Sequence, residues 1–117
     1  MKTKYNIDIN DRMFDKKIAG LVNQFYKILP IKESGEPSLN QYMKSLLREM
    51  IGCKDLITAL DDDAQYLSLL SILEYMIDND CDVATVKTEV FRAIGIVKRM
   101  QAQYANRSGG DSNEHMG

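Results

Sequence analysis

Histidine is almost missing from this sequence, which has only His115 among its 117 residues. A catalytic cysteine or serine needs a neighbouring base, and helix bundles that hold paired metal ions use Glu-x-x-His pairs. The chain also has no glycine-rich loop of the kinds that cradle phosphates. We therefore predict a protein that is not an enzyme, with no catalytic residue, no cofactor and no metal centre.

Cysteine and long apolar runs are also scarce. Cys53 and Cys81 are too few and too isolated for a disulfide framework, so we expect reduced thiols. No apolar run approaches the roughly 20 residues that span a bilayer, and the first residues lack the apolar core of a secretory signal. These absences favour a cytoplasmic protein that does not enter membranes, and its length indicates one domain.

What the sequence does contain is helical periodicity, strongest in YLSLLSILEYMI at residues 66–77. Apolar residues that recur every three or four positions predict four helices, with the third most enclosed. These helices cover residues 11–29, 38–60, 62–78 and 83–104. The predicted fold is an all-α, mainly antiparallel four-helix bundle over residues 10–105. An extended N-terminal arm at 1–9 precedes it, and a disordered tail at 106–117 follows it.

Short motifs predict where the helices begin and end. Pro30 should end the first helix, because the residue before a proline is disfavoured in the helical conformation. The segment from Pro30 to Pro37 then forms a loop by its composition. The pattern Ser38-x-x-Gln41 predicts a capping box for the second helix, and Asp61–Asp63 should turn the chain and cap the third.

The segment DNDCDVATVKTE has the ligand spacing of an EF-hand calcium loop. Asp78, Asp80, Asp82 and Glu89 occupy loop positions 1, 3, 5 and 12. Position 6 is Val83, however, where the sharp turn needs glycine. We therefore favour a turn in which Asp82 caps the fourth helix, and a divalent-ion site remains the alternative.

Basic residues gather on the last predicted helix. Arg92 and Arg99 are one heptad apart and Lys98 is adjacent, so these three residues are candidate phosphate contacts. The whole chain carries a net charge of −2, whereas nucleic-acid-binding domains tend to be strongly basic. A nucleic-acid-associated accessory protein is therefore the alternative function, and a solvated helix face is the simpler interpretation.

Several apolar residues lie outside the stripes that the four-helix bundle needs to bury. They include Ile51 and Leu56 on the second predicted helix, and the candidate interface residues are Leu67, Ile72 and Tyr75 on the third and Ile96 on the fourth. Apolar surface that a fold does not use internally marks an interface. The leading hypothesis is a non-catalytic helical protein–protein interaction module that self-associates, with a homo-oligomer or another protein as the partner.

Two segments carry a resemblance to a group of known proteins. FYKILP at Phe25–Pro30 and SLLREMIGC at Ser45–Cys53 resemble segments of small uncharacterised helical proteins that bacterial phages and mobile elements carry. The resemblance covers about a quarter of the chain and includes no catalytic motif. It implies an accessory or host-interaction role.

Overall fold

The computed structural model describes Thr3 and residues 10–116, with side chains described as far as Ala105. This part of the chain is all-helical, as predicted, and pairs as a β-bridge only at Thr3 and Ile57. Other residues of the predicted extended arm at 1–9 lie outside the described part. The helices are α1 (Asp11–Tyr26), α2 (Ile28–Ser34), α3 (Leu39–Leu56), α4 (Thr58–Asp61), α5 (Ala64–Asp78) and α6 (Val83–Met116).

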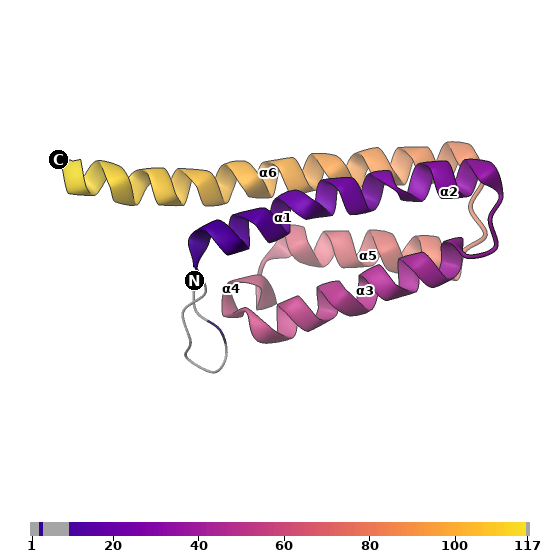
Figure 1. Ribbon diagram of the computed structural model, residues 1–117, viewed down its shortest axis with the longest axis horizontal. Helices are drawn as coiled ribbons and strands as arrows, with labels where there is room; N and C mark the ends of the chain where they lie inside the picture. Colours follow the sequence, from indigo (N-terminus) through magenta and orange to yellow (C-terminus); the bar gives the residue numbers. More distant parts are fainter. Residues whose placement is uncertain (1–2, 4–9, 117) are drawn as a thin grey trace.

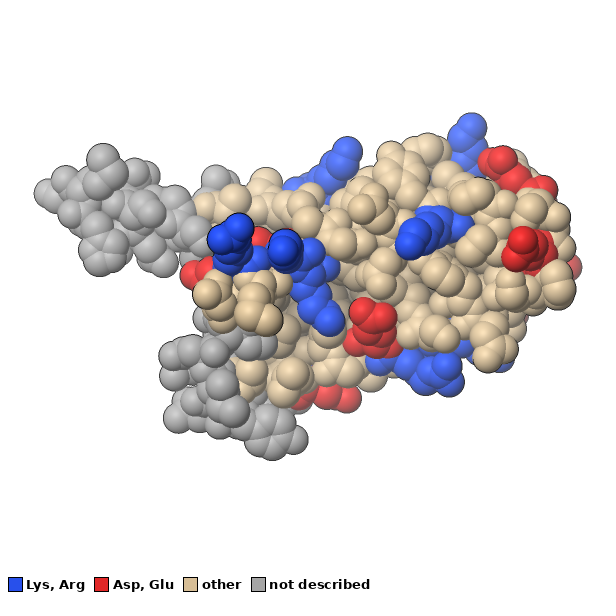
Figure 2. All heavy atoms as spheres, viewed as in Figure 1, with Lys and Arg blue, Asp and Glu red and all other residues tan. Residues whose placement is uncertain are grey.

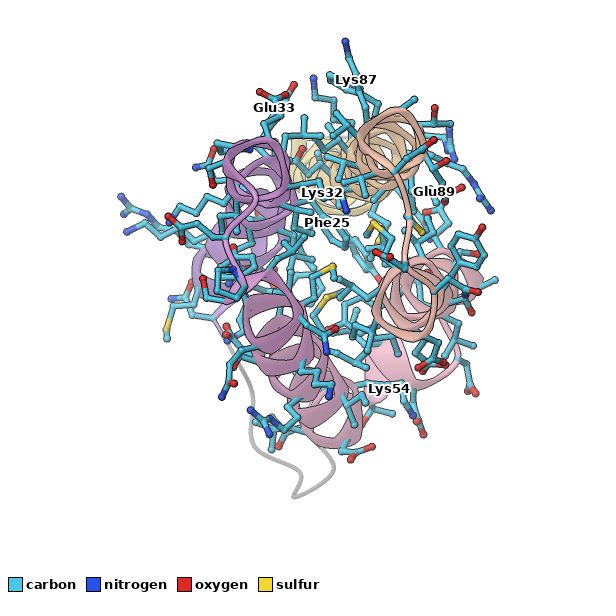
Figure 3. All side chains as sticks on the ribbon, turned by 90° about the vertical axis from the view of Figure 1, so that its right-hand side faces the viewer. Phe25, Lys32, Glu33, Lys54, Lys87 and Glu89 are labelled. Atoms are coloured by element: carbon cyan, nitrogen blue, oxygen red, sulfur yellow. The ribbon has the colours of Figure 1, made fainter. Side chains whose placement is uncertain are left out.

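The helices lie side by side along one long direction (Figure 1). Helices α1 and α2 follow each other along α6, whereas α5 packs between α6 and α3. Viewed from one end, the helices surround a common core (Figure 3). Phe25 points into this core, whereas Glu33 and Lys87 point outward (Figure 3). The core therefore forms where the apolar stripes of all the long helices meet.

The prediction that Pro30 begins a loop is wrong. Helix α1 ends at Tyr26 and α2 begins at Ile28, so Pro30 lies in the first turn of α2. A proline is tolerated in a first turn, but it cannot donate to the carbonyl four residues earlier, which here belongs to Tyr26. Pro30 therefore divides one predicted helix in two. Gly35, in the left-handed conformation with φ +71°, ends α2.

The second predicted helix is also divided. Helix α3 ends at Leu56, and Ile57 is extended, with φ −98° and ψ 112°, where it bridges to Thr3. The predicted capping box is wrong, because the hydroxyl of Ser38 donates to the Glu36 carboxylate at 3.2 Å and caps no helix. The two divisions turn the four predicted helices into six.

Predictions for the later part of the chain are largely confirmed. Asp63 caps α5 by accepting hydrogen bonds from the backbone N–H groups of Gln65 and Tyr66, at 2.9 and 3.0 Å. Helix α6 continues to Met116, however, so its backbone is helical through residues 106–116, where we predicted a disordered tail. Helical hydrogen bonds are made within one segment, so a helix can extend past its packing partners.

Helix α5 supplies the centre of the core, as predicted. Six of its side chains are buried: Tyr66, Leu69, Leu70, Ile72, Leu73 and Met76. The hydroxyl of Tyr66 donates to the backbone carbonyl of Met50 at 2.7 Å, which satisfies a buried polar group and joins α5 to α3. Burial also raises the pKa of the Tyr66 hydroxyl, so it stays a hydrogen-bond donor.

Candidate interaction surfaces

The four predicted interface residues divide into two exposed and two buried. Leu67 and Tyr75 expose 41% and 48% of their surface, whereas Ile72 and Ile96 expose only 2% and 5%. The expectation that Ile72 and Ile96 lie outside the core is therefore wrong. A central helix packed between two neighbours buries more than one stripe, so these two isoleucines belong to the core.

The outward face of α5 combines two large apolar side chains with small and acidic ones. Leu67, Ser71, Glu74, Tyr75 and Asp78 are all exposed, and Ser71 lies midway between Leu67 and Tyr75. At 1.5 Å per residue, each of these two side chains lies about 6 Å along the helix from Ser71. We call this surface the α5 face. It contains no basic residue.

An exposed aromatic pair joins α1 to α6. The rings of Tyr26 and Phe91 lie edge to face with centroids 6.0 Å apart, and 40% and 45% of these residues is exposed. This pair was not predicted from the sequence, because neither residue falls on a regular stripe and no local pattern predicts which residues meet across two helices. Such a pair is worth about 1 kcal/mol beyond its burial.

The three candidate phosphate contacts do not form one free basic ridge. The guanidinium of Arg92 lies 3.1 Å from a carboxylate oxygen of Glu89, one turn earlier. Lys98 and Arg99 are exposed, but successive residues point about 100° apart on a helix. The nucleic-acid hypothesis stays a prediction, and Glu89 partly neutralises one of its three cations.

The segment from Asp78 to Glu89 is built as a helix-capping turn. The Asp82 carboxylate accepts a hydrogen bond from the backbone N–H of Thr85 at 2.8 Å, which confirms the predicted cap. Hydrogen bonds from Thr85 hold the pKa of Asp82 below its usual value. Among the described residues, no group of three or more His, Cys, Asp or Glu side chains is placed to hold a metal ion.

Both cysteines are free thiols. Cys81 is buried, and that burial raises the pKa of its thiol, which favours the protonated, unreactive form. Cys53 is partly buried on α3.

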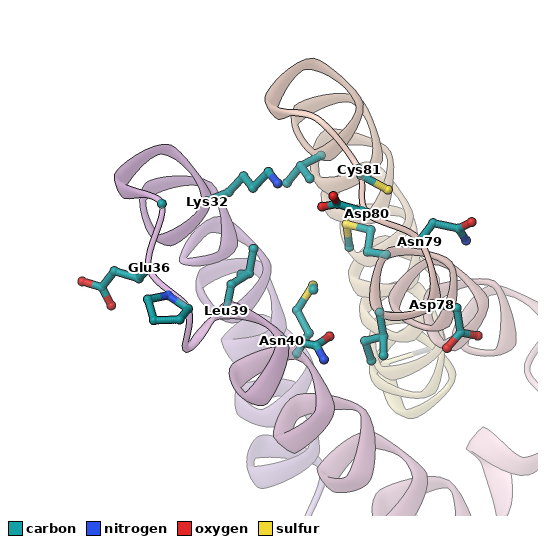
Figure 4. Close-up of a pocket in the computed structure, with 14 residues that line it drawn as sticks. Lys32, Glu36, Leu39, Asn40, Asp78, Asn79, Asp80 and Cys81 are labelled. Carbon is teal, nitrogen blue, oxygen red and sulfur yellow. The ribbon is translucent and has the colours of Figure 1, made fainter.

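A cavity of about 490 Å³ lies at the end of the molecule where two loops approach each other (Figure 4). Lys32 and Glu36 border it on one side, and Asp80 and Cys81 border it on the other (Figure 4). Met43 and Met76 contribute to its apolar part. Lys32 favours the ionised forms of Cys81 and Asp82, but burial outweighs this effect at Cys81.

A groove of about 620 Å³ runs between α1 and α3, and we call it the α1–α3 groove. Its floor consists of buried side chains from four helices, namely Phe14, Ile18, Leu21, Met50, Leu60 and Tyr66. Three lysines and one glutamate line it, Lys16, Lys17, Lys27 and Glu49. Figure 2 shows the face formed by α1 and α3, with Lys and Arg side chains gathered over the first half of α1.

Comparison with known proteins returns no match, whether with protein-family models, curated proteins or solved structures. The resemblance to helical proteins of phages and mobile elements therefore stays a prediction. Within the part of the chain that the structure describes, no helix combines the length and apolarity needed to cross a membrane.

Proposed function

We propose that this chain is a non-catalytic protein–protein interaction module that self-associates through the α5 face. One observation carries this conclusion: two large apolar side chains, Leu67 and Tyr75, are exposed at equal distances on either side of Ser71. A surface used by a two-fold symmetric dimer must be complementary to itself, so that one residue contacts a second and the second contacts the first. The spacing about Ser71 supports the proposal, because it lets Leu67 of each copy meet Tyr75 of the other.

The charges on the α5 face favour one orientation of the two copies. In an antiparallel pair centred on Ser71, Leu67 of each copy lies at the level of Tyr75 of the other. Glu74 then lies at the level of Ser68 of the second copy, and Asp78 at the level of Ala64. A parallel pair would place each carboxylate beside its own equivalent, where like charges repel. We therefore propose the antiparallel pair.

The proposal includes two further predictions from the sequence. We propose that the helices form a mainly antiparallel four-helix bundle, in which α1 and α2 count as one helix. The rest of this bundle holds α5 rigidly, with its outward face exposed. The location is taken to be cytoplasmic, where free thiols such as Cys53 and Cys81 persist. No catalytic step is assigned to any residue.

The mass in solution tests self-association. Light scattering behind size exclusion, over a range of concentrations, should show a dimer for the natural chain and a monomer for Leu67→Glu and Tyr75→Glu. Phe91→Ser is the matched control, because Phe91 is equally exposed but lies on α6, and this variant should stay dimeric. A natural chain that is monomeric at every concentration contradicts the proposal.

Cross-linking tests the orientation. With Cys53 and Cys81 replaced by alanine, Ser71→Cys should form a disulfide between two copies, because a residue on the two-fold axis meets its own equivalent. The required separation of Cα atoms is about 4–7 Å. Thr88→Cys, exposed on α6, should not cross-link. If the Ser71→Cys variant still forms a dimer but its introduced thiols stay reduced under oxidation, self-association stands and the antiparallel register is rejected.

A further inference from the structure

The α1–α3 groove is positively charged in a protein that is negative overall. Among the described residues, its charged lining consists of three lysines and one glutamate, a net charge of +2, whereas the whole chain carries −2. All three lysines lie along α1 or at its C-terminal cap, and Lys16 and Lys27 are 11 residues apart, or about 16 Å along the helix. Cations therefore follow the length of one wall.

The cations differ in how far they are already neutralised. The ammonium of Lys17 lies 3.9 Å from a carboxylate oxygen of Glu49 on the opposite wall, and both side chains are about half exposed. Such exposed pairs contribute little and exchange partners easily. Lys16 and Lys27 form no ion pair with any described residue. An anion in the groove would therefore meet two cations that no described carboxylate neutralises and a third that is weakly held.

The space between the walls is open at Gly20. This residue lies on α1 between Lys16 and Lys27, and a Cβ atom built on it would meet nothing within 4 Å. Below it the floor is apolar, with Ile18 and Leu21 from α1 and Met50 from α3. These floor side chains are each 5% exposed or less, whereas Met13, which also lines the groove, is 66% exposed. A ligand in the groove would cover Met13 and the floor while keeping a charged group at the lysine-lined rim.

We propose that the α1–α3 groove binds an anionic amphiphile, a small molecule with an aliphatic body and one carboxylate or sulfate head. The body lies along the apolar floor beneath Gly20, and the head contacts Lys16, Lys17 or Lys27. The groove volume of about 620 Å³ falls among sites for small molecules, about 300–1,000 Å³.

This site is separate from the α5 face. Helices α1 and α3 lie on one side of the molecule in the end-on view, and α5 lies on the other (Figure 3). Ligand binding and self-association can therefore be measured independently, and failure of one leaves the other standing.

Calorimetric titration with three probes of equal chain length tests the charge requirement. Laurate below its micelle-forming concentration should bind with one molecule per chain, and dodecanol and dodecyltrimethylammonium should bind at least tenfold more weakly. The double variant Lys16→Glu, Lys27→Glu should weaken laurate binding at least tenfold. Equal affinity for all three probes, or no heat with laurate, overturns the proposal.

Filling the groove tests its location. Gly20→Leu places a side chain in the open space and should weaken laurate binding at least tenfold, with helix content and melting temperature retained. Gly95→Leu on α6 is the matched control, because its Cβ position is equally open and lies outside the groove, so affinity should not change. Unchanged binding in Gly20→Leu rejects the site. The proposal is likewise overturned if the chain binds an acidic helical peptide and does not bind laurate.

Discussion

The hydroxyl of Tyr104 donates a hydrogen bond to Oδ2 of Asp63 at 2.7 Å and thereby joins α6 to the beginning of α5. The other oxygen of the same carboxylate, Oδ1, accepts the two backbone N–H groups that it caps. The ring of Tyr104 also lies edge to face with Phe14 of α1, with centroids 4.9 Å apart. One carboxylate and one phenol thus connect three helices.

Removing this connection should destabilise the fold. Asp63→Ala loses a helix cap and leaves the Tyr104 hydroxyl without this acceptor, so we expect a cost of about 2 kcal/mol in free energy of unfolding. Tyr104→Phe should cost about 1 kcal/mol. Urea denaturation of both variants and of the double variant measures the coupling between them. Strict additivity would contradict the direct bond, and Asp63→Asn, which keeps a capping oxygen, is the control.

The two leucines Leu73 and Leu67 should respond very differently to truncation. Leu73 is fully buried in α5, so Leu73→Ala should cost about 2–5 kcal/mol through lost burial and a cavity. Leu67 is 41% exposed, so Leu67→Ala should cost less than about 1 kcal/mol. Thermal unfolding at low protein concentration separates this effect from self-association. Similar losses in the two variants would mean that α5 is rotated from the orientation described.

Glycine substitutions should stabilise or destabilise according to backbone conformation. Gly52 lies inside α3, and a Cβ atom there meets nothing within 4 Å. Gly52→Ala should therefore raise the free energy of unfolding by about 1 kcal/mol. Gly35 has φ +71°, so Gly35→Ala should destabilise by about 1 kcal/mol instead. Calorimetric melting temperatures measure both. A lower melting temperature for Gly52→Ala would show that α3 is not continuous at that position.

Asp82 should contribute to acid sensitivity. Its pKa is lower in the folded chain than in the unfolded one because Thr85 donates hydrogen bonds to the carboxylate. Its stabilising effect is therefore present above the unfolded pKa of about 4 and is lost as the pH falls through the lower, folded value. Asp82→Ser keeps a capping oxygen that does not titrate. On acidification from about pH 5 to pH 2, the urea midpoint should therefore fall less in this variant than in the natural chain. If the two midpoints fall equally, other carboxylates cause the acid sensitivity.

Much of the helical pattern was predictable because its signals are local. The bounds of α5 follow from an unbroken apolar periodicity and from Asp63, whose side chain reaches N–H groups only two and three residues away. The cap at Asp82 is equally local. The prediction that Pro30 begins a loop is wrong, because the same missing N–H group is harmless in a first turn and disruptive in a helix interior.

The candidate sites were predicted less well. The exposure of Leu67 and Tyr75 could be predicted from the helical wheel of one segment, but the same wheel wrongly predicted that Ile72 is exposed. No short segment of the sequence predicts the α1–α3 groove, because its lining residues come from several helices. A spacing rule relates residues within one helix, whereas a groove depends on how far apart two helices lie.

By itself, the sequence determined that the described chain is helical and where its main apolar stripes, caps and charges fall, because these depend on periodicity and on hydrogen bonds between near neighbours. Only the tertiary structure decided that α3 ends where Ile57 meets Thr3, that Tyr26 meets Phe91, and that Ile96 is core. Those outcomes depend on contacts between residues far apart in the chain, which local periodicity does not encode.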